Sequence, residues 1–315
     1  MKHPLVSIIC TCYNHGEFIK GALDSVRNQS YGPIELIIID NGSKDNSVEV
    51  IRNWVKYNED QKLRTIFHFP SINYCKAFNQ GLQKANGKYI IDLSGDDLLL
   101  LDHVKTAVET LENGHAGVYF SNAYLEGEKS GSSEVFYPVN EEGRLLKEVI
   151  SGDIYIHVVQ KHFLCAPTMV FKAEILKKEG GYDQELSYED FDILVRLARK
   201  YGFVFNGNIG VKKRILKTSF SAKQYSIKNS VMLPSTLKVC RKIQAMNKSL
   251  KENEALQFRV MFETKHALAS ANFDTAAEFL NLAQEIGVFG FRYHLFRLWE
   301  KVRLDLSSIY RILIS

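Results

Sequence analysis

The sequence has little of what marks secreted, membrane-spanning or nucleic-acid-binding proteins. Only five cysteines occur among 315 residues, and their odd number and scattered positions do not indicate a disulfide framework. No run approaches the ~20 apolar residues that a membrane-spanning helix needs. The formal net charge is only +4, which is too small to indicate a nucleic-acid partner. We therefore expect a protein of a reducing compartment that binds no nucleic acid.

The N-terminus also lacks the pattern of a secretory signal. One lysine and the short apolar run 5–10 are followed at once by the polar residues 13–16. Cys10 and Cys12 have no second close pair of cysteines to complete a zinc site. These absences predict a cytoplasmic protein.

What the chain does contain is a regular alternation of strand and helix patterns. Strands are predicted at 5–11, 34–40, 63–69 and 88–93, and helices at 18–26, 48–55 and 74–85. This alternation predicts an α/β fold with a mainly parallel sheet, and the near-continuous isoleucine and valine of the strands predict helices on both faces.

The second half of the chain is less regular. It predicts a polar loop at 126–143, a strand at 166–171 and a helix at 187–201. After about Ser221 the pattern is helical with few breakers. We therefore predict a catalytic domain at 1–221 and a C-terminal helical region at 222–315.

Two adjacent carboxylates, Asp96 and Asp97, lie between apolar runs in the segment LSGDDLLLL. Adjacent aspartates repel each other, and burial raises the cost of ionising either one. A magnesium or manganese ion would offset that cost and would also bind the phosphates of a nucleoside diphosphate. Taken alone, the pair is better explained by a solvated helix N-terminus, where the helix dipole favours aspartate.

Polar residues follow the carboxyl ends of three predicted strands, which is where ligands bind in parallel sheets. The topology would bring them to one edge of the sheet. They are Thr11, Tyr13, Asp40, Asn41, Asp96 and Asp97.

Four ordered segments resemble family-two glycosyltransferases, and the similarity covers residues 4 to about 221. The segments are VSIICTCYN (6–14), ELIIIDNGSKDNS (35–47), YCKAFNQGLQKANGKYIIDLSGDD (74–97) and GGYDQELSYEDFDILVRLARKYGF (180–203). The resemblance implies a GT-A (nucleotide-diphospho-sugar transferase-like) fold, with a mainly parallel twisted sheet and flanking helices. It also implies inverting sugar transfer from a nucleotide-sugar.

The resemblance assigns donor-binding roles at the sheet edge. Thr11 and Tyr13 would contact the ribose and base, although Tyr13 could instead cap the sheet edge by packing. Asp40 would read the nucleobase, although Asp-Asn-Gly is also favourable turn chemistry. Asn41 replaces an aspartate of many family members, so base recognition would differ in detail.

The same resemblance assigns the diphosphate site. Asp97 would hold the Mn²⁺ or Mg²⁺ ion, and Asp96 would contact the ribose or the water shell of the metal. Ser94 stands where many members carry a further aspartate. Lys76 would touch phosphate, with a solvated lysine as the alternative, and Asn73 replaces a common glycine.

Glu189 and Asp190 match the acidic pair near the acceptor in the family. Asp190 would act as the general base that takes the proton of the acceptor hydroxyl, and Glu189 would support it. Without the resemblance, the pair would be explained by a solvated helix start. Leu216 stands where many members have a metal-binding histidine, so Arg214 or Lys217 would stabilise the diphosphate instead.

The resemblance implies a glycosyltransferase that uses a UDP-sugar and builds a polysaccharide or another glycan on a glycan or lipid-linked acceptor. A nucleotidyltransferase or a dinucleotide oxidoreductase would need a glycine-rich loop after the first strand, and CTCYNHGEF has none. A non-catalytic relative that binds a nucleotide-sugar or glycan remains the alternative. Leu216 favours it, whereas Asp97 and Asp190 favour the enzyme.

The C-terminal segment 288–315 mixes aromatic residues with arginine and lysine at roughly helical spacing. This pattern fits peripheral contact with an anionic membrane surface at the inner face of the membrane. A helical subdomain packed on the catalytic domain, or the face of a homodimer, is the favoured alternative, since amphipathic helices usually face a core.

Overall fold

The computed structural model describes residues 3–58, 62–127, 133–161, 163–216 and 220–314. The chain divides into two compact units. We call Met1–Ile154, Leu164–Gln184 and Arg196–Leu216 the sheet unit, and Tyr155–Phe163, Glu185–Val195 and Lys217–Ser315 the helical unit. The helical unit takes in two short segments that precede Ser221 in the sequence, and the predicted boundary near that residue stays a prediction.

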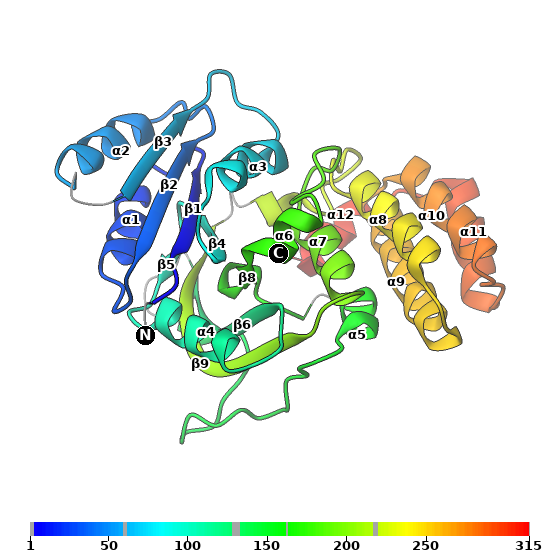
Figure 1. The fold of residues 1–315 in the computed structure, drawn as a ribbon. Helices are drawn as coiled ribbons and strands as arrows, with labels where there is room; N and C mark the ends of the chain where they lie inside the picture. Colours follow the sequence, from blue (N-terminus) through cyan, green and yellow to red (C-terminus); the bar gives the residue numbers. More distant parts are fainter. Residues whose placement is uncertain (1–2, 59–61, 128–132, 162, 217–219, 315) are drawn as a thin grey trace. The chain divides into compact units, whose positions relative to one another are not determined.

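The first half of the sheet unit consists of βαβ units. Its four strands are parallel and stand in the order β3-β2-β1-β4 (Figure 1). They are β1 Val6–Cys12, β2 Ile34–Asp40, β3 Lys62–Phe67 and β4 Tyr89–Ser94, and the helices are α1 Ile19–Arg27, α2 Ser47–Lys56 and α3 Tyr74–Lys84. The predicted elements of this region are confirmed, and their ends differ by no more than two residues.

Beyond β4 the sheet is mixed, and the described residues form nine strands in all. β8 pairs antiparallel with β4 and β6, β9 runs parallel to β6, and β5 pairs antiparallel with β9. The bounds are β5 Leu98–Leu99, β6 Val118–Gly127, β7 Ser133–Val135, β8 Val170–Lys172, β9 Phe203–Ile215, α4 His103–Glu112, the 3₁₀ turn η1 Ala166–Thr168 and α6 Ala173–Lys178. The predicted α/β class is confirmed.

Three details differ from the sequence prediction. The polar segment 126–143 is not all loop, because β6 extends to Gly127 and β7 pairs with it. The strand predicted at 166–171 begins only at Val170, since a proline-containing 3₁₀ turn precedes it. The helix predicted at 187–201 is shorter, and is α7 Asp190–Ala198.

Helices cover both faces of the parallel strands, and most side chains of β1, β2 and β4 are apolar. All residues of β1 are buried, and α1 packs Ile19 and Leu23 into the same core as Ile8. α3 approaches the other face so closely that Gly81 has no room for a side chain. A Cβ there would lie 2.8 Å from Ile9 Cγ2 and 2.9 Å from Ile39 Cδ1.

The helical unit confirms the predicted helical C-terminal region. Its helices are α5 Tyr155–Gln160, the 3₁₀ turn η2 Phe220–Lys223, α8 Leu233–Met246, α9 Leu250–Ala269, α10 Phe273–Glu285, α11 Phe291–Val302 and α12 Ser307–Ile314 (Figure 1). The long helix α9 packs against α5, α8, α10 and α11. It carries a buried ion pair, in which Arg259 Nη1 lies 3.4 Å from Glu263 Oε1.

No described helix combines the length and the apolar character that crossing a bilayer requires.

Candidate active site

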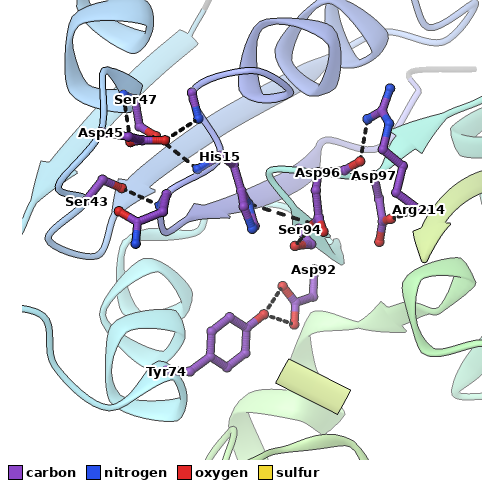
Figure 2. Close-up of polar contacts among 12 residues, drawn as sticks. His15, Ser43, Asp45, Ser47, Tyr74, Asp92, Ser94, Asp96, Asp97 and Arg214 are labelled. Atoms are coloured by element: carbon purple, nitrogen blue, oxygen red, sulfur yellow. Dashed lines mark hydrogen bonds and ion pairs between the residues drawn. The ribbon is translucent and has the colours of Figure 1, made fainter. Parts of the chain in front are cut away.

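The carboxyl ends of β1, β2 and β4 lie side by side at one edge of the sheet. The strand register pairs Cys12 with Asp40, and Thr11 with Ile39 on one side and Ser94 on the other. The loops that follow these strands carry the residues predicted to bind the donor. Figure 2 shows side chains from all three loops near this edge.

The loop after β1 is held in place by the loop after β2. The backbone N–H groups of Asn14, His15 and Gly16 donate hydrogen bonds to Ser43 Oγ (2.9 Å), Ser47 Oγ (3.0 Å) and Asp45 Oδ2 (2.8 Å) (Figure 2). In return, the Lys44 N–H donates to Asn14 Oδ1 at 2.7 Å. Asn14 adopts a left-handed backbone with φ of 56°. The adjacent Tyr13 is 43% exposed, so its ring is available for stacking.

Three buried polar atoms at this edge have no hydrogen-bond partner within the described residues. They are Thr11 Oγ1, Asp40 Oδ2 and His15 Nδ1. The other oxygen of Asp40 accepts from the N–H groups of Gly42 and Ser43 at 3.1 and 2.9 Å, which fixes the carboxylate. Because buried polar groups are normally paired, this arrangement fits a polar ligand that supplies the missing partners.

Asn41 lies beside Asp40, but its side-chain amide hydrogen-bonds to the backbone of the chain. Its Nδ2 donates to the Ile72 carbonyl at 2.8 Å, and its Oδ1 accepts from the Ile72 N–H at 3.1 Å. This pair of bonds ties the end of β2 to the segment before α3. The predicted role of Asn41 in nucleotide binding stays a prediction.

Asp96 and Asp97 occupy the turn after β4. Ser94 Oγ donates to Asp96 Oδ1, and His15 Nδ1 lies 3.8 Å from the same oxygen. Asp97 Oδ1 accepts from the backbone N–H of Arg214 at 2.9 Å, and the Arg214 guanidinium donates to the Asp96 carbonyl at 2.5 Å (Figure 2). Arg214 of strand β9, which is distant in the sequence, therefore stabilises the acidic turn by these hydrogen bonds.

The electrostatics of this turn fit a cation. Burial, and next the charge of Asp96, raise the pKa of the Asp97 carboxyl to about 7 although Lys213 and Arg214 act against the shift. A divalent ion would supply the positive charge that favours the ionised form. No cluster of three or more potential metal ligands occurs within the described ranges. A cation on Asp97 would therefore take most of its ligands from phosphate and water, as magnesium commonly does.

Asp92 is a carboxylate of this region that sequence reasoning missed. The Tyr74 hydroxyl donates to both of its oxygens, at 2.8 and 2.9 Å, and the Tyr182 hydroxyl donates to Oδ2 at 2.7 Å. Burial raises the pKa of Asp92 to about 6, and the two tyrosine hydroxyls oppose that shift. A single polar residue inside the apolar strand YIIDLS was the available signal.

Lys76 stands in the first turn of α3 with an exposed side chain. Asn73 caps this helix, because its side chain accepts from the Lys76 backbone N–H at 3.1 Å. A glycine at position 73 could not make this capping hydrogen bond, because it has no side chain. The predicted contact of Lys76 with phosphate stays a prediction.

Glu189 and Asp190 belong to the helical unit, at the start of α7. Asp190 Oδ1 accepts from the Phe191 N–H at 2.7 Å, and the Glu189 carbonyl accepts from Ile193 at 3.1 Å. Their predicted catalytic roles stay predictions.

Of the two residues predicted to stabilise the diphosphate, Lys217 lies outside the described residues. Arg214 is held by its contacts with the acidic turn, and its guanidinium stacks over the Phe18 ring at 4.9 Å.

Comparisons with known proteins agree with this geometry. A family model described as glycosyl transferase family 2 matches residues 7–178. An uncharacterized glycosyltransferase of Rickettsia typhi is 28% identical over 217 residues, which cover 67% of this chain and 64% of the relative. The match thus spans less than two thirds of the length of that relative.

Solved structures are similar in fold. S. aureus TarS 1–349 in complex with UDP-GlcNAc superposes with a TM-score of 0.70 at 16% identity, covering 97% of this chain and 91% of that chain. The mannosyltransferase PcManGT from Pyrobaculum calidifontis, in complex with GDP-Man and Mn²⁺, gives a TM-score of 0.60 at 16% identity, covering 99% and 88%. At this identity the likeness concerns the fold alone. Because the family model covers more than half of its residues, the chain belongs to glycosyl transferase family 2.

Proposed function

We propose that the protein is a cytoplasmic, metal-dependent, inverting glycosyltransferase of the hexosyltransferase type. It would move a sugar from a nucleotide-diphosphate donor, a UDP-sugar, to a glycan or lipid-linked acceptor in surface polysaccharide biosynthesis. The observation that carries the proposal is the set of unsatisfied groups at the sheet edge. Asp40 Oδ2 and Thr11 Oγ1 are buried and have no hydrogen-bond partner in the part of the chain that the structure describes, and the buried Asp97 has a raised pKa.

Each of these groups has a task in donor binding. Asp40 is a fixed acceptor for an N–H of the nucleobase, and Thr11 offers a hydroxyl beside it. Tyr13 would stack on the base. Asp97, with Asp96 beside it, would hold the divalent cation, which when bound would stabilise the negative charge that develops on the leaving diphosphate.

The transfer itself needs a base for the acceptor. An inverting reaction removes the proton of the attacking hydroxyl as that oxygen bonds to the anomeric carbon from the side opposite the diphosphate. We assign this task to Asp190 and a supporting role to Glu189, on the family resemblance of their segment. The proposed acceptor class rests on the same resemblance, because no described residue identifies the acceptor.

Thermal denaturation with UDP, GDP and dTDP, each with and without Mn²⁺, tests the proposal. A nucleotide at 100 times its Kd stabilises the folded state by about 2.7 kcal/mol, so we expect UDP with Mn²⁺ to raise the Tm by several degrees. In Asp97→Asn the additional rise in Tm that Mn²⁺ gives should be lost. In Asp40→Asn the rise in Tm with UDP should be lost. Asp102→Asn, at an exposed aspartate of the same unit, is the control. A flat response to all three nucleotides would overturn the proposal.

A further inference from the structure

Helix α11 of the helical unit exposes apolar side chains along the face that points away from its packing partners. Tyr293 and Phe296 are buried, and the helix packs on α9 and α10 through this inner face (Figure 1). Four apolar residues at positions i, i+4, i+7 and i+11 lie on the outer face. Their exposed fractions are 84% for Phe291, 49% for Leu295, 60% for Leu298 and 64% for Val302.

The spacing makes these four residues one continuous stripe. At 3.6 residues per turn their directions fall within a narrow sector, opposite the sector of Tyr293 and Phe296. The residues next to the helix extend the apolar surface, since Phe289 before it and Leu304 after it are also exposed. A helix that only packs on a protein core would present polar residues on its outer face. The stripe therefore indicates a second apolar contact.

The charges beside the stripe are almost all positive. Arg292 lies on one side of it and Lys301 lies on the other, both exposed. Glu300 is the only acidic residue of α11, and it lies on the packed side, 3.9 Å from Arg297. Beyond the helix, Asp305 pairs with Lys228 at 2.8 Å, and Glu254 lines a groove of about 410 Å³ with Phe258 and Arg292.

From this arrangement we propose that the stripe of α11, with Phe289 and Leu304, binds peripherally to the surface of an anionic lipid bilayer. The apolar side chains enter the interface between headgroups and acyl chains, while Arg292 and Lys301 stay at the level of the anionic headgroups. Trp299 suits this depth as an amphipathic ring, and its Nε1 donates to the Leu304 carbonyl at 2.7 Å.

The charge pattern favours lipid over a second copy of this chain. In a two-fold pairing of the stripe, the helices meet through the same patch. In an antiparallel pair each side of the stripe faces the same side of the other helix, so neither Arg292 nor Lys301 would meet an acidic residue of α11. Anionic headgroups provide the opposite charge instead. The inference does not depend on the proposed transfer reaction.

Co-sedimentation of the full chain with lipid vesicles tests the inference. Vesicles of phosphatidylcholine alone are compared with vesicles that contain equal parts of phosphatidylcholine and phosphatidylglycerol. We expect binding to the anionic vesicles only, weakened by salt. The double variant Arg292→Gln/Lys301→Gln should lose about fivefold in partition for each basic residue removed. Phe291→Ser/Leu298→Ser should abolish binding.

Leu250→Ser is the matched control, because Leu250 is an exposed apolar residue of the same unit outside the stripe. It should bind vesicles as the unaltered chain does. Circular dichroism and the thermal response to UDP confirm that each variant is folded and separate a failure here from a failure of the proposed function. Equal sedimentation with both vesicle types, or an equal loss in Leu250→Ser, would overturn the inference. So would a dimer in solution that only the stripe variant disrupts, since a second copy would then cover this face.

Discussion

Replacing Asp92 with asparagine should change how the stability of the protein depends on pH. Asp92 is half-buried in the sheet unit and accepts hydrogen bonds from the hydroxyls of Tyr74 and Tyr182. Burial raises the pKa of this carboxyl from 3.8 to about 6 in the folded state. The folded protein therefore holds a proton on Asp92 more tightly than the unfolded chain does.

The sign and size of the effect follow from that difference. A raised folded-state pKa contributes stability that is fully present below about pH 4 and is lost as the pH rises through 6. The whole contribution is about 3 kcal/mol, at 1.36 kcal/mol for each pKa unit. Between pH 5 and pH 8 the unaltered chain should lose about 1.4 kcal/mol from this group alone.

Urea unfolding at a series of pH values measures the effect. The free energy of unfolding of Asp92→Asn, relative to the unaltered chain, should rise by about 1.4 kcal/mol from pH 5 to pH 8. Tyr182→Phe removes a donor to the ionised carboxyl, so the loss should extend to higher pH. Tyr57→Phe, at an exposed tyrosine, is the control. Parallel curves for Asp92→Asn and the unaltered chain would refute the reasoning.

Three further changes have definite expected outcomes. Glu263→Ala should lower the free energy of unfolding by about 3–5 kcal/mol in urea, because it leaves the buried Arg259 without its counter-charge, and a loss below 1 kcal/mol would contradict this. Gly81→Ala should cost about 1–3 kcal/mol in the same assay, since its Cβ meets Ile9 and Ile39, and an unchanged stability would show that α3 shifts freely. Asp190→Asn should lower kcat by about 10²–10⁴ with an unchanged UDP thermal shift, whereas near-normal turnover would remove Asp190 as the base.

The parallel half of the fold could be predicted because local pattern and tertiary structure agree there. The run Ile34–Asp40 is almost entirely apolar and is followed by Asn-Gly, so its bounds as a strand follow directly from the sequence. β7 could not be predicted, since Ser133–Val135 lies in a polar segment and is a strand only because β6 is beside it. The position of β8 between β4 and β6 likewise depends on long-range pairing that no local pattern records.

The candidate site divides in the same way. Thr11, Asp40 and Asp97 follow strand ends, and topology alone assigns them to one edge. The bond from the Arg214 N–H to Asp97 joins residues far apart in the sequence, so periodicity could not reveal it. Asp92 was missed because it stands within a strand and its partners come from α3 and from the segment before α7.

The loops after β1 and β2 depend on each other through reciprocal hydrogen bonds, so one cannot be replaced without the other. Three consecutive amides, at residues 14–16, depend on side chains of Ser43, Ser47 and Asp45, while Asn14 serves Lys44 in return. A chimera that takes one of these loops from a relative would leave its backbone amides unmatched. Donor preference in this scaffold should therefore be exchanged by grafting both loops together.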